Sequence, residues 1–190
     1  MAELPDEELC SRVAARDDRA FEALVERYQA RAYRLAYSVL GSEADARDVS
    51  QDAFIKLFES AGKFSGRSQF STWFYRIVVN LCIDHKRHYR WWSKIVPLRS
   101  SLPEGDETGV EPVSSEPGPE AEAMGHETST ELAAAFVHLS PNQRVAVLLQ
   151  VQDGLSSREI AEVLSCSEST ARVHIHRGLA ALKKLLKKDE

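Results

Sequence analysis

Apolar residues recur at every third or fourth position along most of this chain, which is the spacing of one face of an α-helix. The first stripe runs over 21–39 and is followed by Gly41, a residue that commonly ends helices. Ser42 is placed to cap a second helix that ends near residue 60, and a third helix is expected over 69–89. Strand-like alternation is absent, so the pattern predicts an all-α protein.

The helical pattern stops between residues 97 and 127. This segment is rich in Pro, Gly, Ser and acidic residues. Such a composition cannot bury enough apolar surface to order itself, so we expect a flexible acidic linker. The chain is therefore predicted to form two helical domains, one over 1–96 and one over 128–190, joined by this linker.

The C-terminal part carries clear helix-start signals. After a short helix expected over 131–139, Ser140 with Gln143 and Ser156 with Glu159 form two capping boxes. The helix that begins after Ser156 is expected to end near Leu164, and after the three residues of a tight turn a last helix is expected to run to about residue 187.

Two helices joined by so short a turn, the second of them basic, form a helix-turn-helix layout. The face of the last helix that would pack on the domain contains Ala171, Ile175, Gly178 and Leu182. The face that would remain outside contains Ser169, Val173, His176 and Ala180. Helix-turn-helix pairs also occur as plain packing units, so DNA binding and a purely structural role both stay open on this pattern alone.

The net charge is −5, which by itself argues against a nucleic-acid binder, but the charged residues are unevenly distributed along the chain. Residues 102–127 hold eight acidic residues and no Lys or Arg, and the rest of the chain has 24 basic and 21 acidic residues. Basic residues concentrate in 76–99 and in 172–188. Because local charge determines where phosphates bind, these two stretches are candidate nucleic-acid contacts.

The helix expected over 69–89 has a polar face beside its apolar stripe. A protein that opens duplex DNA holds unpaired bases with apolar pockets, polar contacts to base edges and nearby cations. An ordinary solvated helix face explains Arg67, Arg76 and Asn80 equally well, and core packing is the main interpretation for Trp73. Two interpretations also stay open for the acidic stretch near the start of the second helix. Its residues complement the helix dipole and are solvated, or they form an acidic docking surface for a basic partner; they are Asp45, Asp48, Gln51 and Asp52.

Several classes of protein are disfavoured. No apolar run is long enough to span a membrane and the N-terminus lacks a signal peptide, so we expect a soluble, cytoplasmic protein without membrane insertion. Cys10, Cys82 and Cys166 are far apart and fit no zinc-ligand spacing, which favours a structural role for each. No phosphate-binding loop, metal-ligand cluster or nucleophile with a base is evident, so neither an enzyme nor a metal or other cofactor is expected.

Four stretches in order resemble the conserved regions of extracytoplasmic-function sigma factors of bacterial RNA polymerase, including the envelope-stress sigma-E-like subtype. They are AFEALVERY at 20–28, DARDVSQDAF at 45–54, the stretch from Phe64 through FSTWFYRIVVNLCIDHKR at 70–87, and the helix-turn-helix region from LSPNQRVAVLL at 139 through STARVHIHRGLAALKK. The resemblance covers nearly everything outside the linker. It implies a subunit that binds core polymerase, directs it to the −10 and −35 promoter elements and promotes strand opening.

The resemblance also implies roles for matching residues. Docking on the clamp coiled coil of the largest polymerase subunit would fall to Asp45, Asp48, Gln51, Asp52 and Phe54. Reading and melting of the −10 element would fall to Arg67, Ser68, Phe70, Trp73, Arg76, Asn80 and Arg87, with a flipped base held by the loop before Phe70. Contacts with the −35 element would fall to Ser169, Thr170, Arg172, Val173, His174, His176 and Arg177. An anti-sigma factor is a further expected partner.

This sequence departs from the family pattern at a few positions. Arg47 stands where an acid is usual, and Ser165 replaces a frequent turn glycine. His174, His176 and Leu179 stand where the family often has arginine or other residues, which thins the cationic surface. The alternative function is a helix-turn-helix regulator that does not associate with core polymerase; it would explain residues 128–190 but not the helix around Trp73.

Overall fold

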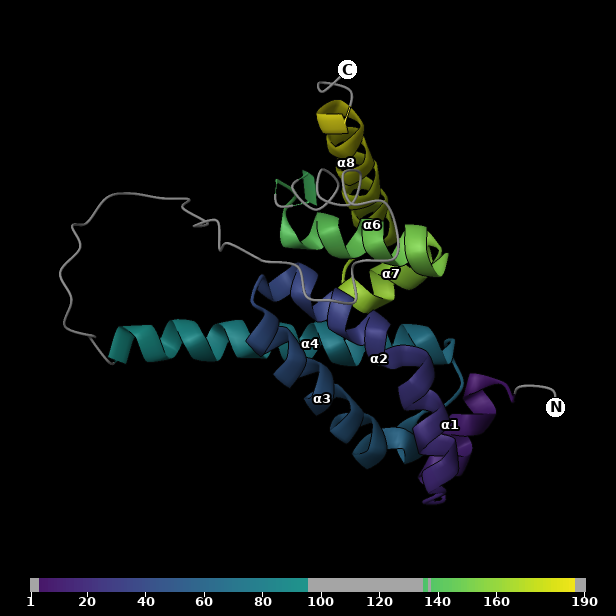
Figure 1. Cartoon of the computed structure of the whole chain (residues 1–190). Coiled ribbons are helices and arrows are strands. Elements are labelled where there is room, and N and C mark those ends of the chain that lie inside the picture. Colours follow the sequence, from purple (N-terminus) through teal and green to yellow (C-terminus); the bar gives the residue numbers. More distant parts are fainter. Residues whose placement is uncertain (1–3, 96–134, 137, 187–190) are drawn as a thin grey trace.

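The computed structural model describes residues 4–95, 135–136 and 138–186. The regular secondary structure of these residues is helical, with no strand among them, which confirms the all-α class (Figure 1). The elements are α1 (Asp6–Ala14), α2 (Asp18–Leu40), α3 (Glu43–Ser60), the 3₁₀ helix η1 (Ala61–Lys63), α4 (Phe70–Ile95), α6 (Pro141–Asp153), α7 (Ser157–Leu164) and α8 (Glu168–Leu186). The predicted linker, and most of the helix expected over 131–139, lie outside the described residues.

The ends of α2 and α3 follow local capping chemistry. The Asp17 carboxylate accepts hydrogen bonds from the first backbone N–H groups of α2, and Gly41 ends this helix in the left-handed conformation, with φ of 73°. The Ser42 hydroxyl accepts from the backbone N–H of Asp45 and starts α3. The predicted boundary between these two helices is thereby confirmed.

Helix α1 is an element that the sequence pattern does not indicate. It has only nine residues and buries three of them, Leu9, Cys10 and Val13. Its first residue, Asp6, accepts hydrogen bonds from the Tyr28 hydroxyl and the Arg27 guanidinium on α2. Burial and the hydrogen bond to Asp6 raise the pKa of Tyr28, so this phenol stays neutral and acts as the donor.

The core of the N-terminal bundle is a group of aromatic rings around α4. Phe70 and Phe74 are fully buried and stack on each other with ring centroids 5.9 Å apart. The Tyr28 ring meets them edge-on at 5.2 and 5.5 Å, and the Phe54 ring lies 5.1 Å from Phe74. Aromatic rings bury large apolar areas and favour such edge and offset geometries, so this group fixes α4 against α2 and α3.

The C-terminal helices begin where the sequence predicts. Both capping boxes are formed, at Ser140 with Gln143 and at Ser156 with Glu159. Gly178 lies where α8 crosses α6; a Cβ atom at this position would come within 2.6 Å of a Val147 methyl carbon. The glycine therefore permits the close approach of the two helices.

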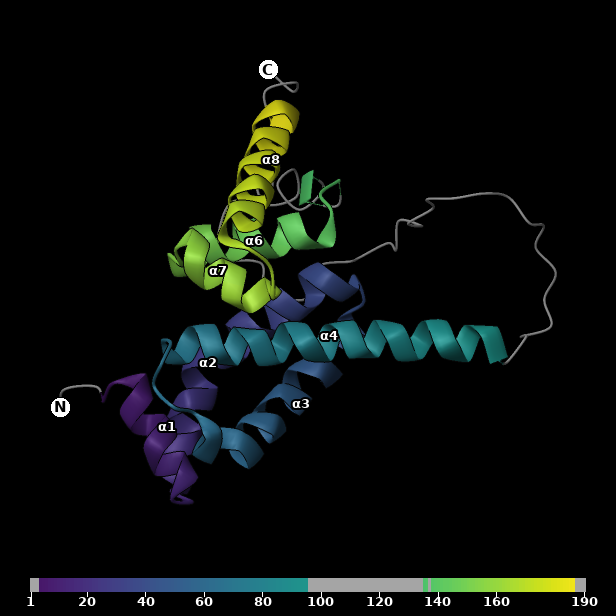
Figure 2. The same cartoon turned by 180° about the vertical axis from the view of Figure 1, so that it is seen from behind.

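The two helical parts of the chain pack directly on each other. Helix α6 lies against α2 and α7 lies against α4, as both opposite views show (Figures 1 and 2). Buried residues of both parts belong to one continuous apolar cluster, which includes Val79 and Cys82 on α4 and Ile160 and Val163 on α7. The sequence did not indicate this contact between the two predicted domains, because the linker composition carries no information about contacts between the helices on either side.

Two buried cysteines contribute to this packing as apolar groups. Burial raises the pKa of Cys10 to about 11 and that of Cys82 to about 12, so both thiols stay protonated near neutral pH. Cys166 is half-buried in the turn between α7 and α8, and all three thiols are free of disulfides. Their surroundings fit the structural role expected from the sequence.

The crossing at Gly178 yields a prediction about stability. Gly178→Val forces the new side chain into Val147, and such overpacking lowers the free energy of unfolding by about 1–3 kcal/mol. Urea unfolding of the full chain measures this change. Gly62→Ala is the matched control because a Cβ atom there meets open space. Equal unfolding midpoints for the Gly178 variant and the unsubstituted chain would contradict the close approach.

Candidate protein and nucleic-acid interfaces

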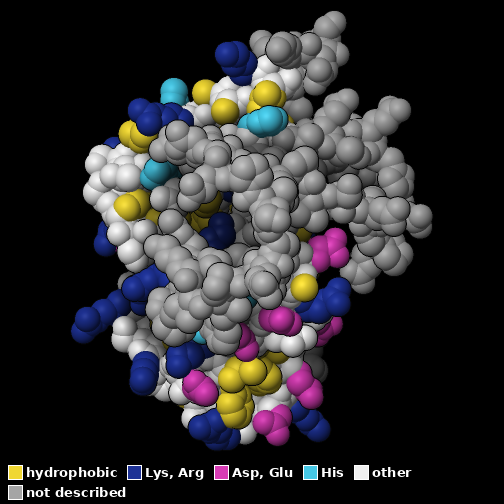
Figure 3. Space-filling view, turned by 90° about the vertical axis from the view of Figure 1, so that its left-hand side faces the viewer, with side chains coloured by type: hydrophobic (Ala, Val, Ile, Leu, Met, Phe, Trp, Pro, Cys, Tyr) yellow, Lys and Arg dark blue, Asp and Glu magenta, His cyan; other side chains and the backbone are white. Residues whose placement is uncertain are grey.

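The outer face of α3 is acidic and exposed. Packing of Val49, Ala53 and Leu57 against the bundle turns the opposite side of the helix outward. Asp48, Gln51 and Asp52 are exposed there, as the sequence predicts. Figure 3 shows apolar side chains bordered by Asp and Glu side chains over the lower part of the face on which α3 lies. An acidic surface with an apolar centre suits a partner helix that carries both basic and apolar residues.

Two predicted docking residues lie elsewhere. The Asp45 carboxylate at the start of α3 lies 3.6 Å from the His85 ring nitrogen on α4, so it links the two helices. Phe54 is only 8% exposed and belongs to the aromatic core. The exposed apolar residue of this face is its neighbour Ile55, at 57%. Helical spacing from Asp48 and Gln51 would have revealed Ile55, because residues three, four and seven positions apart share a face.

Helix α4 presents three different sides. Phe70 and Phe74 lie in the aromatic core, whereas the buried Tyr75 donates a hydrogen bond to Asp153 of α6, and α4 also packs against α7. The remaining side stays exposed and contains Arg76, Asn80 and Arg87. Of the predicted −10 residues, the structure thus displays these three and also Arg67 on the preceding loop, while it buries Phe70 completely.

An aromatic cluster marks the start of α4. Trp73 is half-buried, with its ring 5.3 Å from that of Phe64 and 6.0 Å from that of Phe70. Trp73 packs on the core, which is the main interpretation from the sequence, and it also reaches the surface. Ser68 is also half-buried in the loop that leads into the helix.

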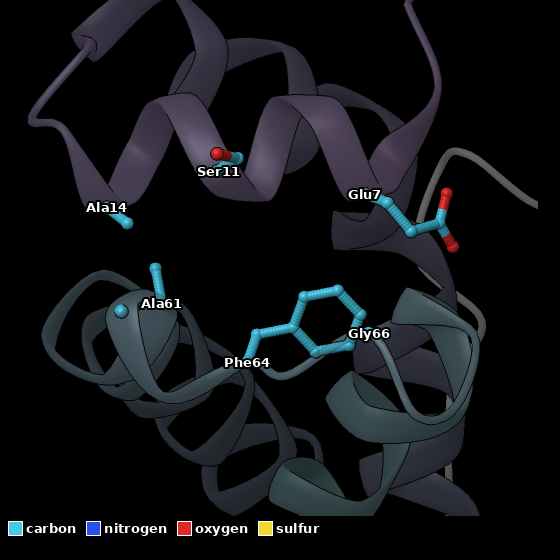
Figure 4. A pocket seen from close by; sticks show the side chains of 7 residues that line it. Glu7, Ser11, Ala14, Ala61, Phe64 and Gly66 are labelled. Atoms are coloured by element: carbon cyan, nitrogen blue, oxygen red, sulfur yellow. The ribbon is translucent and has the colours of Figure 1, made fainter.

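A pocket of about 340 Å³ lies between α1 and the loop before α4 (Figure 4). Phe64 points into it from the loop, with Gly66 beside it, and Glu7 and Ser11 line it from α1. The Glu7 carboxylate also accepts a hydrogen bond from the backbone N–H of Phe70 at 3.1 Å, which holds the loop against α1. An aromatic ring with polar groups nearby is the combination that binds a single unstacked base.

Helix α8 has the two faces that the sequence predicts. Ala171, Ile175, Gly178 and Leu182 are buried, whereas Ser169, Val173, His176 and Ala180 are exposed. Thr170, Arg172 and Arg177 are exposed as well, and His174 is half-buried. The −35 residues predicted from the sequence thus form one surface, with short polar side chains at the start of α8 and cations further along.

The cation nearest the start of α8 is held by an acid. The Glu168 carboxylate accepts hydrogen bonds from Arg172 and, at 3.1 Å, from the Ser157 hydroxyl of α7. These hydrogen bonds lower the pKa of Glu168, so it stays ionised near neutral pH. Ser165, in the turn between the two helices, has φ of 52°, so the left-handed position often filled by glycine is filled by serine here.

Within the part of the chain that the structure describes, no cluster of His, Cys, Asp or Glu side chains is arranged to hold a metal ion. Among the described helices, none is both long enough and apolar enough to cross a bilayer. Exposed polar and charged residues on α3, α4 and α8 form the candidate binding surfaces of the described residues.

Two family models match this chain. The model of Sigma-70 region 2 matches residues 24–92, which include α3 and most of α4. The model of Sigma-70 region 4 matches residues 129–182, which include the helix-turn-helix. We refer to these two parts of the chain below as region 2 and region 4.

Named relatives extend over both parts. The chain is 32% identical to the ECF RNA polymerase sigma factor SigW of Bacillus subtilis, over 90% of this chain and 91% of the relative. It is 32% identical to the ECF RNA polymerase sigma-E factor of Escherichia coli, over 95% and 93%. The solved sigma factor RpoE of Bartonella quintana, bound to the anti-sigma factor NepR, has the same fold, with a TM-score of 0.68, 22% identity and coverage of 90% and 98%. These matches extend over nearly the whole chain, and the protein belongs to the extracytoplasmic-function (ECF) sigma factors.

Proposed function

We propose that this protein binds core RNA polymerase, directs it to promoters through −10 and −35 elements, and promotes strand opening, with α3, α4 and α8 as the three contact surfaces. The observation that carries this assignment is that the family match spans both regions of one chain. Each region exposes a polar or charged helix face opposite its buried side. Run-off transcription with reconstituted holoenzyme tests it, because a repressor or an enzyme gives no promoter-dependent initiation.

The α3 face is the polymerase contact in this proposal. Asp48 and Asp52 supply negative charge that steers the encounter with a basic helix, and Gln51 supplies a neutral hydrogen-bonding group. Ile55 is the apolar centre of this face, where an anchor residue contributes most once water is excluded. Phe54 supports the surface from beneath through its contact with Phe74.

The α4 face and the adjacent pocket are the −10 contact. Arg76 and Arg87 neutralise phosphates, and the Asn80 amide can donate to and accept from a base edge. The pocket of Figure 4 is the place for an extruded base, with the Phe64 ring as a stacking surface and Glu7 and Ser11 as edge contacts. Capture of an unpaired base stabilises the open duplex, so the free energy of binding that base also favours melting.

The α8 surface is the −35 contact. Ser169 and Thr170 lie at the N-terminal end of the helix, where recognition helices contact base edges and phosphates. Val173 can contact a thymine methyl group, and Arg172 and Arg177 bind phosphate or guanine. His174 and His176 add ring nitrogens that hydrogen-bond with either partner.

Two further aspects of the proposal concern the cellular setting. The B. quintana relative has an anti-sigma factor as its partner, which supports an anti-sigma factor as a regulator of this chain. The protein acts where core polymerase acts, in the cytoplasm, as a non-enzymatic subunit without a cofactor. A helix-turn-helix regulator independent of polymerase is disfavoured, because such a regulator would not account for the region 2 match.

Charge reversal on α3 tests the polymerase contact. Asp48→Arg places a cation against a basic partner surface, so we expect affinity for core enzyme to fall at least about 30-fold, or about 2 kcal/mol. Ile55→Ala should weaken binding by about 1–2 kcal/mol through lost apolar burial. Titration of labelled chain with core enzyme measures both. Glu26→Arg, at an exposed position on α2, is the charge-matched control. Equal affinities of Asp48→Arg and this control for core enzyme would contradict the assignment.

Substitutions on the exposed side of α4 test the melting role. Asn80→Ala and Arg76→Ala should leave core binding intact and reduce the open-complex population about tenfold each, because a base contact is worth about 1–3 kcal/mol. Fluorescence of a base analogue placed in the −10 element reports the opening. Arg12→Ala on α1, which removes a cation that pairs with Glu8, is the control. If opening is unchanged while transcription is lost, α4 acts at another step.

The α8 contact is tested by salt dependence in holoenzyme. Arg172→Ala should weaken promoter binding and reduce the log–log salt slope by about 0.9, the value for one phosphate contact. Glu168→Gln should instead strengthen promoter binding, because it removes the acid that competes with phosphate for Arg172. Binding of a −35 duplex at several salt concentrations gives both slopes. An unchanged slope for Arg172→Ala would mean that this guanidinium contacts no phosphate.

A further inference from the structure

One large aliphatic side chain lies in the middle of the polar side of α4. Ile83 is 48% exposed. It follows Asn80 by three residues and precedes Arg87 by four, a spacing that places all three on one face of the helix. Arg76, seven residues before Ile83, continues the same face and is exposed as well. The face proposed to contact the −10 element therefore has an apolar residue between its polar and cationic ones.

Ile83 belongs to a small group of exposed apolar residues. Among the residues that the structure describes, the large apolar side chains with this degree of exposure are Ile55, Ile83, Val151, Val173 and Leu179. A single exposed aliphatic residue needs no special explanation by itself. Ile55 and Val173, however, lie on the two other proposed contact faces, and Ile83 lies on the third. Val151, on α6, lies outside all three and provides a natural comparison.

The charges around Ile83 suit an anionic partner. Arg76 and Arg87 are exposed on either side of it along the helix, and Lys86 is exposed beside it. The Arg87 guanidinium lies 3.8 Å from the Asp84 carboxylate, with 79% and 71% of the two side chains exposed. So exposed an ion pair is weak, so Arg87 remains able to bind phosphate. Cations at both ends of this face attract a nucleic-acid backbone and bring base edges toward Ile83.

Helix geometry indicates which part of the DNA Ile83 faces. A rise of about 1.5 Å per residue separates Arg76 from Arg87 by about 16 Å, the length of about five base pairs. Ile83 lies about 20 Å beyond Phe70, where α4 begins near the pocket of Figure 4. From this end of α4 the chain continues toward region 4, whose proposed target is the upstream −35 element. The pocket end of α4 is thus suited to an unpaired base, and the Ile83 end to the paired DNA upstream of it.

We propose that Ile83 recognises the methyl group of a thymine in the paired, upstream part of the −10 element. Its side chain has no hydrogen-bond donor or acceptor, and the apolar group on a base edge in the major groove is the thymine methyl. The other base edges present donors or acceptors that a hydrocarbon side chain would leave unpaired. Ile83 therefore selects a T·A pair at one position. This inference rests on the proposed function for the identity of the α4 face.

The thymine contact is tested with reconstituted holoenzyme on a promoter that run-off transcription identifies. Each thymine of the upstream −10 element is replaced in turn by uracil, which lacks the methyl group and keeps the pairing edge. At one position we expect promoter affinity to fall about fourfold, the value for one buried methyl group at about 0.8 kcal/mol. Ile83→Ala should lower affinity for the thymine promoter by a similar factor. Fluorescence anisotropy of labelled duplexes measures both.

The combination of the two changes gives the decisive result. Both remove the same contact, so together they should weaken binding about fourfold rather than about sixteenfold. Ile83→Val keeps a branched apolar side chain and should still distinguish thymine from uracil. Val151→Ala shortens an exposed aliphatic side chain elsewhere and should leave both affinity and discrimination unchanged. Ile83→Lys should bind more tightly at low salt, with a steeper salt dependence, and lose the discrimination.

The same titrations distinguish failure of this inference from failure of the proposed function. If holoenzyme with the unsubstituted chain shows no promoter-specific binding, the proposed function is wrong. If it binds and initiates, but the effects of Ile83→Ala and uracil multiply at every upstream position, the thymine contact alone is refuted. A −10 element without a thymine in its paired upstream part would refute it as well.

Discussion

The packing of α4 on two of its sides is the constraint on which the rest of the molecule depends. One side contributes Phe70 and Phe74 to the aromatic core with Tyr28, and another contributes Tyr75 to the contact with region 4. A helix buried on two sides has one side left, and that side carries Arg76 and Asn80. The same packing that fixes the helix therefore selects the residues available to nucleic acid.

A similar division governs α3 and α8. In both helices most apolar residues face inward, and the opposite side forms the proposed contact surface, which is mainly polar and charged but includes Ile55 on α3 and Val173 on α8. Gly178 illustrates how closely the two sides are linked, since its missing side chain lets α8 approach α6 and so sets the position of Arg172 and Arg177. Rigid helices on a packed core hold such surfaces in a defined geometry, which is what recognition of a duplex groove requires.

The contact between the regions adds a second level of organisation. Asp153 would be costly to bury alone, and its hydrogen bond with Tyr75 and its proximity to Arg31 offset that cost.

Sequence alone determined the features that depend on neighbours a few residues apart: the helix boundary at Gly41 and Ser42, the two capping boxes, and the two faces of α8. The same local spacing favours Ile55 over Phe54 as the exposed apolar residue of α3, whereas the contact of Phe54 with Phe74 of α4 is made only in the folded chain. Tyr75 and Asp153 are 78 residues apart, and neither is unusual in its local segment. Their contact, and with it the packing of region 4 on region 2, was decided by the tertiary structure, because a buried ion needs partners that only the folded chain brings together.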